Sequence, residues 1–181
     1  MLIGIVGTLG AGKGTVVEYL KHKGYAHYSA SGYLRELMVA RNIPIDRDAY
    51  SRVSGEIRYL DPAGLVRALY ERVIADGGPD AVIESIHDDG EAAFIKEMGG
   101  VLLGVDADMM VRYDRIIIRG TEKDNVTFEE FTEQIKREET GGGHHNIRSV
   151  LGTADYLIEN NGTLEELHTK VDDFLATLSR A

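Results

Sequence analysis

Short apolar runs alternate along the chain with segments whose apolar residues recur at helical spacing. Most runs are rich in Val, Ile and Leu and end at a glycine or a polar turn, which is typical of strands buried on both faces of a sheet. Such strands alternating with helices predict an α/β fold, with a mainly parallel, five-stranded sheet between two helical layers. The expected strands cover residues 2–6, 25–29, 81–86, 101–105 and 155–159.

Capping residues mark where several helices are expected to begin. Ser29 or Ser31 can cap a helix that runs to residue 42, shortly before a proline. Asp61 and Pro62 fit the N-cap and the first position of another helix. Apolar spacing predicts helices over 12–24 and 91–98, and two capping boxes predict helix starts at Thr127 with Glu130 and at Thr163 with Glu166.

Composition narrows the functional classes. A length of 181 residues fits one domain, and the chain has no apolar run long enough to cross a bilayer, so we expect a cytoplasmic, soluble protein. A net charge of -10 argues against broad binding to nucleic-acid backbones. The chain has no cysteine, which excludes disulfides, thiolate zinc sites and cysteine nucleophiles.

The stretch GTLGAGKGT, from Gly7 to Thr15, carries the strongest chemical signal. It follows an expected strand and opens an expected helix, as a phosphate-binding loop must. Its backbone N–H groups and the helix N-terminus form an anion site, and Lys13 would reach the terminal phosphates. The usual hydroxyl after the lysine is replaced by Gly14, with Thr15 one residue later. We expect the donor phosphates to bind at Gly7, Gly10, Ala11, Gly12, Lys13, Gly14 and Thr15.

The form GxxGxGKGT resembles the loop of the nucleoside monophosphate kinases, adenylate kinase above all. In that family a glycine commonly follows the lysine, and magnesium is held largely through water and nucleotide oxygens. The segment SASGYLR, residues 29–35, looks like the family's S-T-G-D-x-L-R. The resemblance implies that Arg35 binds the acceptor phosphate and that Ser31 lies near the acceptor base.

The segment DRIIIR, residues 114–119, is similar to the D-R-x-x-x-R that opens the lid of these kinases. This implies that Arg115 packs on the donor base and that Arg119 meets its phosphates. The two arginines are four residues apart and share a helix face. In IKREE, Arg137 stands where the second lid helix supplies another arginine. The implied catalytic cations are Lys13, Arg119 and Arg137.

The chain departs from the family after the third expected strand. Adenylate kinases have Asp-Gly-x-x-Arg there, and this chain has ESIH. Glu84 could replace the aspartate and hold Mg²⁺ through water, with Thr15 as the other protein group at the metal. His87 stands about where the arginine is expected and is equally consistent with a loop histidine without a role. Arg58 could then supply the charge that binds the acceptor.

The ending TADYLIENNGTLEEL resembles dephospho-coenzyme A kinases, with the backbone of residues 160–163 bordering the donor adenine. Together the resemblances imply one P-loop kinase domain over residues 1–181. Its core would comprise residues 1–30, 79–111 and 150–181, with an acceptor-binding helical region at 31–78 and a short helical lid at 112–149. His144 and His145 fall in a glycine-rich turn of that lid, which we interpret as a polar turn rather than a metal site.

Three functional hypotheses follow. The first is an ATP- and Mg²⁺-dependent kinase that phosphorylates a nucleoside or deoxynucleoside monophosphate. The second changes the acceptor to dephospho-coenzyme A, and the third is a nucleotide-dependent binding or assembly factor on a kinase fold. The expected partner is a small nucleotide-like acceptor, not a nucleic acid or a membrane, and the oligomeric state stays open.

Overall fold

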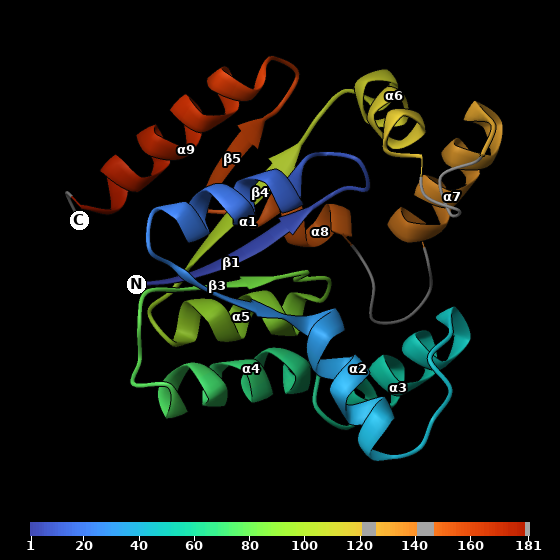
Figure 1. Cartoon of the computed structure of the whole chain (residues 1–181), viewed down its shortest axis with the longest axis vertical. Helices are drawn as coiled ribbons and strands as arrows, with labels where there is room; N and C mark the ends of the chain where they lie inside the picture. The colour runs from blue at the N-terminus through green and yellow to red at the C-terminus, as the bar shows by residue number, and fades with distance from the viewer. Residues whose placement is uncertain (121–125, 141–146, 180–181) are drawn as a thin grey trace.

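A parallel sheet forms the centre of the molecule (Figure 1). The computed structural model describes residues 1–120, 126–140 and 147–179, without the side chains of Arg47, Gln134 and residues 137–140. Five strands lie in the order β2-β3-β1-β4-β5, and every pair of neighbours is parallel. They are β1 (Leu2–Gly7), β2 (Ala26–Ser29), β3 (Ala81–Glu84), β4 (Val101–Asp106) and β5 (Tyr156–Glu159). The predicted strands and α/β class are confirmed, except that the third strand ends at Glu84 and not at residue 86.

Helices cover both faces of this sheet, which makes the three-layer α/β/α arrangement that the apolar runs predict. In Figure 1 α1 and α9 lie on one side of the strands and α4 and α5 on the other. The helices are α1 (Lys13–His22), α2 (Ala30–Ala40), α3 (Arg47–Leu60), α4 (Gly64–Ala75), α5 (Asp89–Glu97), α6 (Met109–Arg119), α7 (Phe128–Thr140), α8 (Ile147–Gly152) and α9 (Leu164–Leu178).

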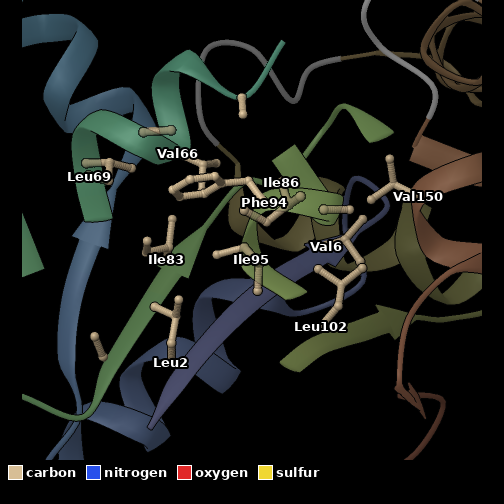
Figure 2. Packing of buried hydrophobic residues seen from close by; sticks show 14 of the residues in the cluster. Leu2, Val6, Val66, Leu69, Ile83, Ile86, Phe94, Ile95, Leu102 and Val150 are labelled. Atoms are coloured by element: carbon tan, nitrogen blue, oxygen red, sulfur yellow. The ribbon is translucent and has the colours of Figure 1, made fainter. Parts of the chain in front are cut away.

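Two hydrophobic clusters hold the layers together. On one face, Val17 and Leu20 of α1 and Phe174 of α9 pack against the strands. On the other face, side chains of α4, α5 and α8 pack against the strands; Figure 2 shows this cluster, with Phe94 and Val150 among its labelled members. Burial on both faces explains why the strands are short runs of apolar residues without a polar alternation.

Helix starts agree with the capping prediction at several sites and disagree at one. Both capping boxes form, with Thr127 and Glu130 opening α7 and Thr163 and Glu166 opening α9. Ser29, rather than Ser31, caps α2 by accepting a hydrogen bond from Gly32 N at 3.2 Å.

The prediction that Asp61 and Pro62 begin the next helix is wrong by two residues. The helix that follows, α4, begins at Gly64, and Asp61 instead ends α3, a helix that we did not predict. The Asp61 carboxylate accepts a hydrogen bond from Ala63 N at 2.9 Å, and its carbonyl accepts one from Gly64 N at 2.8 Å. Asp61 therefore closes a tight turn between two helices.

No helix among the described ranges has both the length and the apolar character needed to cross a membrane.

Candidate active site

The loop between β1 and α1 adopts the backbone that a phosphate-binding nest requires. Gly10 and Gly12 have positive φ angles of 79° and 99°, a region that glycine enters without a steric penalty. Both positions are also crowded, because a Cβ atom at Gly10 would lie 2.6 Å from the Arg112 carbonyl oxygen, and one at Gly12 would strike Asn160 Nδ2. Gly14 differs, since a Cβ there would meet no atom within 4 Å.

Lys13 is the first residue of α1, and its ammonium group lies over the loop. Its Nζ atom donates hydrogen bonds to the carbonyl oxygens of Gly7 at 2.6 Å and Thr8 at 2.9 Å. The cation therefore stands beside the backbone N–H groups of the nest, and both favour an anion at this place.

A cleft of about 740 Å³ opens along the loop. Arg115 and Arg119 line it from α6, so two of the arginines expected at the donor share one cavity with the loop. Thr8, Leu9, Glu18 and Ile116 line it as well, and the sequence analysis assigned them no role. The expected loop residues that line the cleft are Gly10, Gly12, Lys13, Gly14 and Thr15.

Hydrogen bonds to the residues after β5 hold the edge of the Arg115 guanidinium group. Its Nη1 atom donates to the carbonyl oxygen of Asn160 at 2.8 Å, and Nη2 lies 3.4 Å from Asn160 Oδ1 and 3.5 Å from the Gly162 carbonyl oxygen. Bonds in the guanidinium plane leave its faces available, and a planar guanidinium face can stack on an aromatic base. The structure thus brings together Arg115 and the backbone segment predicted to border the adenine.

The sequence analysis predicted a role for the backbone at Asn160 but none for its side chain. It is 4 % exposed, and its Nδ2 atom donates to the Ala11 carbonyl oxygen at 2.8 Å. It follows β5 directly, and polar residues at the carboxyl ends of parallel strands meet at one edge of the sheet. That position is the signal that could have identified it.

Arg112 is buried next to the loop, and some of its hydrogen-bond donors are unsatisfied. Its side chain is 3 % exposed, and Nε and Nη1 make no hydrogen bond to any described residue. Nε lies 3.9 Å from Asp106 Oδ1, an oxygen that already accepts hydrogen bonds from Thr8 Oγ1 at 2.6 Å and Ala107 N at 2.9 Å. Arg112 is therefore a weakly compensated cation.

Two predicted features fall outside the described part of the chain. Arg137 belongs to α7, but its side chain is not described, and His144 and His145 lie within the range 141–146 that the structure leaves out. The catalytic role of Arg137 and the interpretation of the two histidines stay predictions.

Glu84 ends β3, next to the start of α2. Its Oε1 atom accepts a hydrogen bond from Ser29 Oγ at 2.9 Å and lies 3.4 Å from His27 Nε2, and Ser29 Oγ lies 3.0 Å from Ser31 Oγ. The contact with His27 lowers the pKa of Glu84 below its usual 4.5. Partial burial raises this pKa, but the hydrogen bond from Ser29 and the charge of Lys13 lower it further. Glu84 is therefore ionised at neutral pH.

The predicted acceptor arginines differ in environment. Arg35 lies exposed on α2, and the structure gives it no hydrogen bond or ion pair with another described residue. Arg58 is buried, with its Nε atom 2.8 Å from Glu91 Oε1. Since Glu91 already compensates this charge, the placement of Arg58 gives no support to its predicted role at the acceptor.

His87 lies in the turn that Glu91 organises. The second carboxylate oxygen of Glu91 accepts hydrogen bonds from the backbone N–H groups of His87 at 2.8 Å and Asp88 at 3.3 Å. Burial raises the pKa of Glu91, although the Arg58 charge acts the other way. The turn is thus fixed by its backbone, and whether the His87 side chain meets the acceptor stays a prediction.

Comparison with known proteins agrees with the phosphate-binding geometry. A family model described as an AAA domain matches residues 3–139. The chain belongs to this AAA domain family. A UPF0200 protein of Pyrococcus horikoshii is 29% identical to this AAA domain protein over 185 residues, covering 98% of this chain and 97% of the relative.

Solved structures with the same fold include small-molecule kinases. Shikimate kinase from Bacteroides thetaiotaomicron matches with a TM-score of 0.65 and 15% identity, covering 99% of this chain and 98% of that one. Dephospho-CoA kinase from Campylobacter jejuni matches with a TM-score of 0.56 and 11% identity, covering 99% of this chain and 98% of that one. At these identities the likeness establishes a P-loop kinase-like fold for this AAA domain protein and leaves the acceptor open.

Proposed function

We propose that this protein is an ATP-dependent phosphotransferase that transfers the γ-phosphoryl group to a small nucleotide-like acceptor, specifically a nucleoside or deoxynucleoside monophosphate. The observation that carries the proposal is the cleft in which Lys13 and the glycine nest meet Arg115 and Arg119. A nest, a lysine and two arginines in one cavity suit a ligand that has several phosphates and a planar base.

In the proposed mechanism the protein positions the reactants and neutralises charge. The loop N–H groups and Lys13 bind the donor phosphates, the face of Arg115 packs on the base, and Arg119 approaches the phosphate chain. The bond between the γ-phosphorus and its bridging oxygen breaks while an acceptor oxygen bonds to the same phosphorus in line. Phosphoryl transfer depends mainly on such positioning and electrostatic stabilisation.

Magnesium fits this site without a protein cage. The described residues contain no group of three or more His, Cys, Asp or Glu side chains that could hold a metal ion. Mg²⁺ commonly keeps several waters and binds phosphate oxygens with one or two protein groups. Here Thr15 and Glu84 would hold it, Glu84 through water, and the ion, when bound, would supply further charge neutralisation at the phosphates.

The acceptor would bind on the other side of the loop, near α2. Arg35 is exposed and carries no partner among the described residues, so its guanidinium is available for a bidentate contact with a monophosphate. Ser31 would contact the acceptor base, with Glu84 and His87 nearby. A monophosphate needs no general base, because its attacking oxygen is already anionic.

One observation favours an alcohol acceptor such as dephospho-coenzyme A as the second candidate. Glu84 is an ionised, partly buried carboxylate, so it could accept the proton that a hydroxyl group loses on phosphorylation, although its lowered pKa makes it a weak base. Arg35 would then bind the phosphate of the acceptor at a distance from the reacting hydroxyl.

Substitution of Lys13 tests the proposal. Lys13→Met should lower the rate of phosphoryl transfer by about a hundredfold or more, because it removes a cation that contacts the transferred group. Lys23→Met provides the matched control, since Lys23 ends the same helix and pairs with Asp172 away from the cleft. A Lys13→Met protein with full transfer activity would contradict the proposed function.

A further inference from the structure

Asn160 has an amide side chain buried between two parts of the proposed donor site. It directly follows β5 and is 4 % exposed. A buried amide that forms hydrogen bonds at both ends is fixed in orientation, since each bond that it loses leaves a buried polar atom without a partner.

One end of this amide contacts the phosphate-binding loop. Nδ2 donates a hydrogen bond to the Ala11 carbonyl oxygen at 2.8 Å. The same nitrogen lies against the α-carbon of Gly12, because a Cβ atom there would strike it. Gly12 is the residue before Lys13 and has φ 99°, so Asn160 supports the loop where its backbone is left-handed.

The other end contacts the arginine expected at the base. Asn160 Oδ1 lies 3.4 Å from Arg115 Nη2, and the Asn160 carbonyl oxygen accepts a hydrogen bond from Nη1 at 2.8 Å. Asn160 N donates to the Asp106 carbonyl oxygen at 2.7 Å, which ties the residue to the neighbouring strand β4. The residue is therefore anchored to the sheet while it contacts both the loop and Arg115.

We propose that Asn160 is a positioning residue that holds the phosphate-binding loop and Arg115 in a fixed relation, so that the base and the triphosphate of the donor are bound together. The inference rests on the proposed function and extends it to a residue outside the loop and the arginines. It predicts that base binding and phosphate binding are energetically coupled through one side chain.

An isosteric substitution separates the two contacts. In Asn160→Asp the carboxylate can still accept from Arg115, but it cannot donate to the Ala11 carbonyl oxygen and repels it. In Asn160→Ala both side-chain contacts are lost. Asn160→Asp should therefore weaken binding of tripolyphosphate and of a non-hydrolysable ATP analogue by similar factors, whereas Asn160→Ala should weaken binding of the ATP analogue more.

Lys170→Met is a matched control. Lys170 Nζ donates to the carbonyl oxygen of Glu159, the residue just before Asn160, at 2.6 Å. The substitution disturbs the end of the same strand without removing a contact to the loop. We expect both affinities to stay within about twofold of wild type, as for surface changes away from a site.

The deciding experiment is a double-mutant cycle measured by titration calorimetry with the full chain and the ATP analogue. Asn160→Ala should lower affinity by about tenfold with Arg115 present and by about threefold or less in an Arg115→Ala background, because contacting residues are not additive. Equal factors in both backgrounds, or unchanged affinity, would overturn the inference. Should Asn160→Ala not fold, the same cycle with Asn160→Ser, whose shorter side chain also loses both contacts, decides in its place.

The wild-type titration separates this inference from the proposed function. A wild-type protein that binds neither the ATP analogue nor tripolyphosphate contradicts the proposed function, and the inference falls with it. A wild-type protein that binds the ATP analogue more tightly than tripolyphosphate, with no coupling between Asn160 and Arg115, contradicts the inference alone.

Discussion

Ser85 has a left-handed backbone directly after Glu84, with a φ angle of 70°. A residue with a Cβ atom loses about 1–2 kcal/mol in this conformation, whereas glycine does not. The backbone N–H of the next residue, Ile86, donates to the Ile5 carbonyl oxygen at 3.1 Å, so the turn is anchored to β1 beside the loop. The backbone strain at Ser85 therefore lies directly after Glu84, at the strand end that borders the proposed acceptor site.

We predict that Ser85→Gly raises the free energy of unfolding by up to about 1 kcal/mol, the relief of strain being partly offset by the entropy of glycine in the unfolded chain. Urea denaturation measures the change, and Ser85→Ala, which keeps a Cβ atom, is the control without such a gain. A less stable Ser85→Gly protein would show that the serine side chain makes a compensating contact.

Arg112 yields a second prediction of increased stability, in which the substitution removes a buried charge. Its Nε and Nη1 atoms are buried without hydrogen bonds to described residues. Replacing a poorly compensated buried ion by an apolar side chain of similar length should raise the free energy of unfolding by about 1 kcal/mol or more. Arg112→Met tests this by chemical denaturation, and a clear loss of stability would show that the pair with Asp106 is worth more than its 3.9 Å separation suggests.

The pH dependence of stability should report on Glu84. Its pKa is lowered in the fold, first by His27, so its contribution to stability is present at and above the ordinary value of 4.5 and is lost as the pH falls through the lowered value. The difference in unfolding free energy between wild type and Glu84→Gln should therefore shrink as the pH is lowered from neutral to well below 4.5. A constant difference across that range would contradict this assignment.

At the scale of elements, the buried pair of Arg58 and Glu91 joins α3 to the start of α5. Each charge compensates the other, and Glu91 also holds the turn at His87. The pair therefore couples the helical region expected to bind the acceptor to the strand end that carries Glu84.

We predict that Arg58→Met lowers the free energy of unfolding by about 3–5 kcal/mol, because it leaves a buried carboxylate without its partner. The double variant Arg58→Met/Glu91→Gln should recover much of this loss, since a neutral amide can still accept from the His87 N–H. Thermal or urea unfolding of the two proteins compares them. A double variant no more stable than Arg58→Met would argue that packing, not charge, dominates.

Local signals in the sequence predict the features that depend on neighbouring residues. The strands and both capping boxes are of this kind, since a few residues decide each. The start of α4 was mispredicted because Asp61 serves the end of α3, and the turn between the two helices decides which role it takes. A helix over 47–60 was missed, although Ala49, Val53 and Ile57 recur at helical spacing among many charged residues.

Contacts between distant segments are what the sequence could not predict. Arg58 finds Glu91 and Asn160 finds Ala11 only because the strand order brings their elements together. The loop and the pair Arg115 and Arg119 on α6 were predictable because each depends on local spacing, and the structure places them along one cleft. Whether Ser31, Arg35 and His87 share an acceptor site stays a prediction.

At the scale of the whole molecule, charge is distributed unevenly. The chain carries a net charge of -10, yet Lys13, Arg115 and Arg119 line the cleft with Glu18 as the acidic residue among its described lining. The sheet order places the β1 loop beside β4, with the β5 end beyond it, so one edge of the sheet gathers the loop, Asp106 and Asn160. This acidic protein thus carries a local cationic cleft, as the anionic donor of the proposed function requires.

The most direct test of the central claim is ADP release by the full chain with Mg²⁺ and ATP, first without acceptor and then with each nucleoside and deoxynucleoside monophosphate and with dephospho-coenzyme A, with products identified by mass. The account predicts a large rise with a nucleoside or deoxynucleoside monophosphate, together with its phosphorylated product. A rise with dephospho-coenzyme A alone would support the kinase and move the acceptor to an alcohol. Slow hydrolysis unchanged by every acceptor would contradict the account and favour a nucleotide-dependent binding or assembly factor.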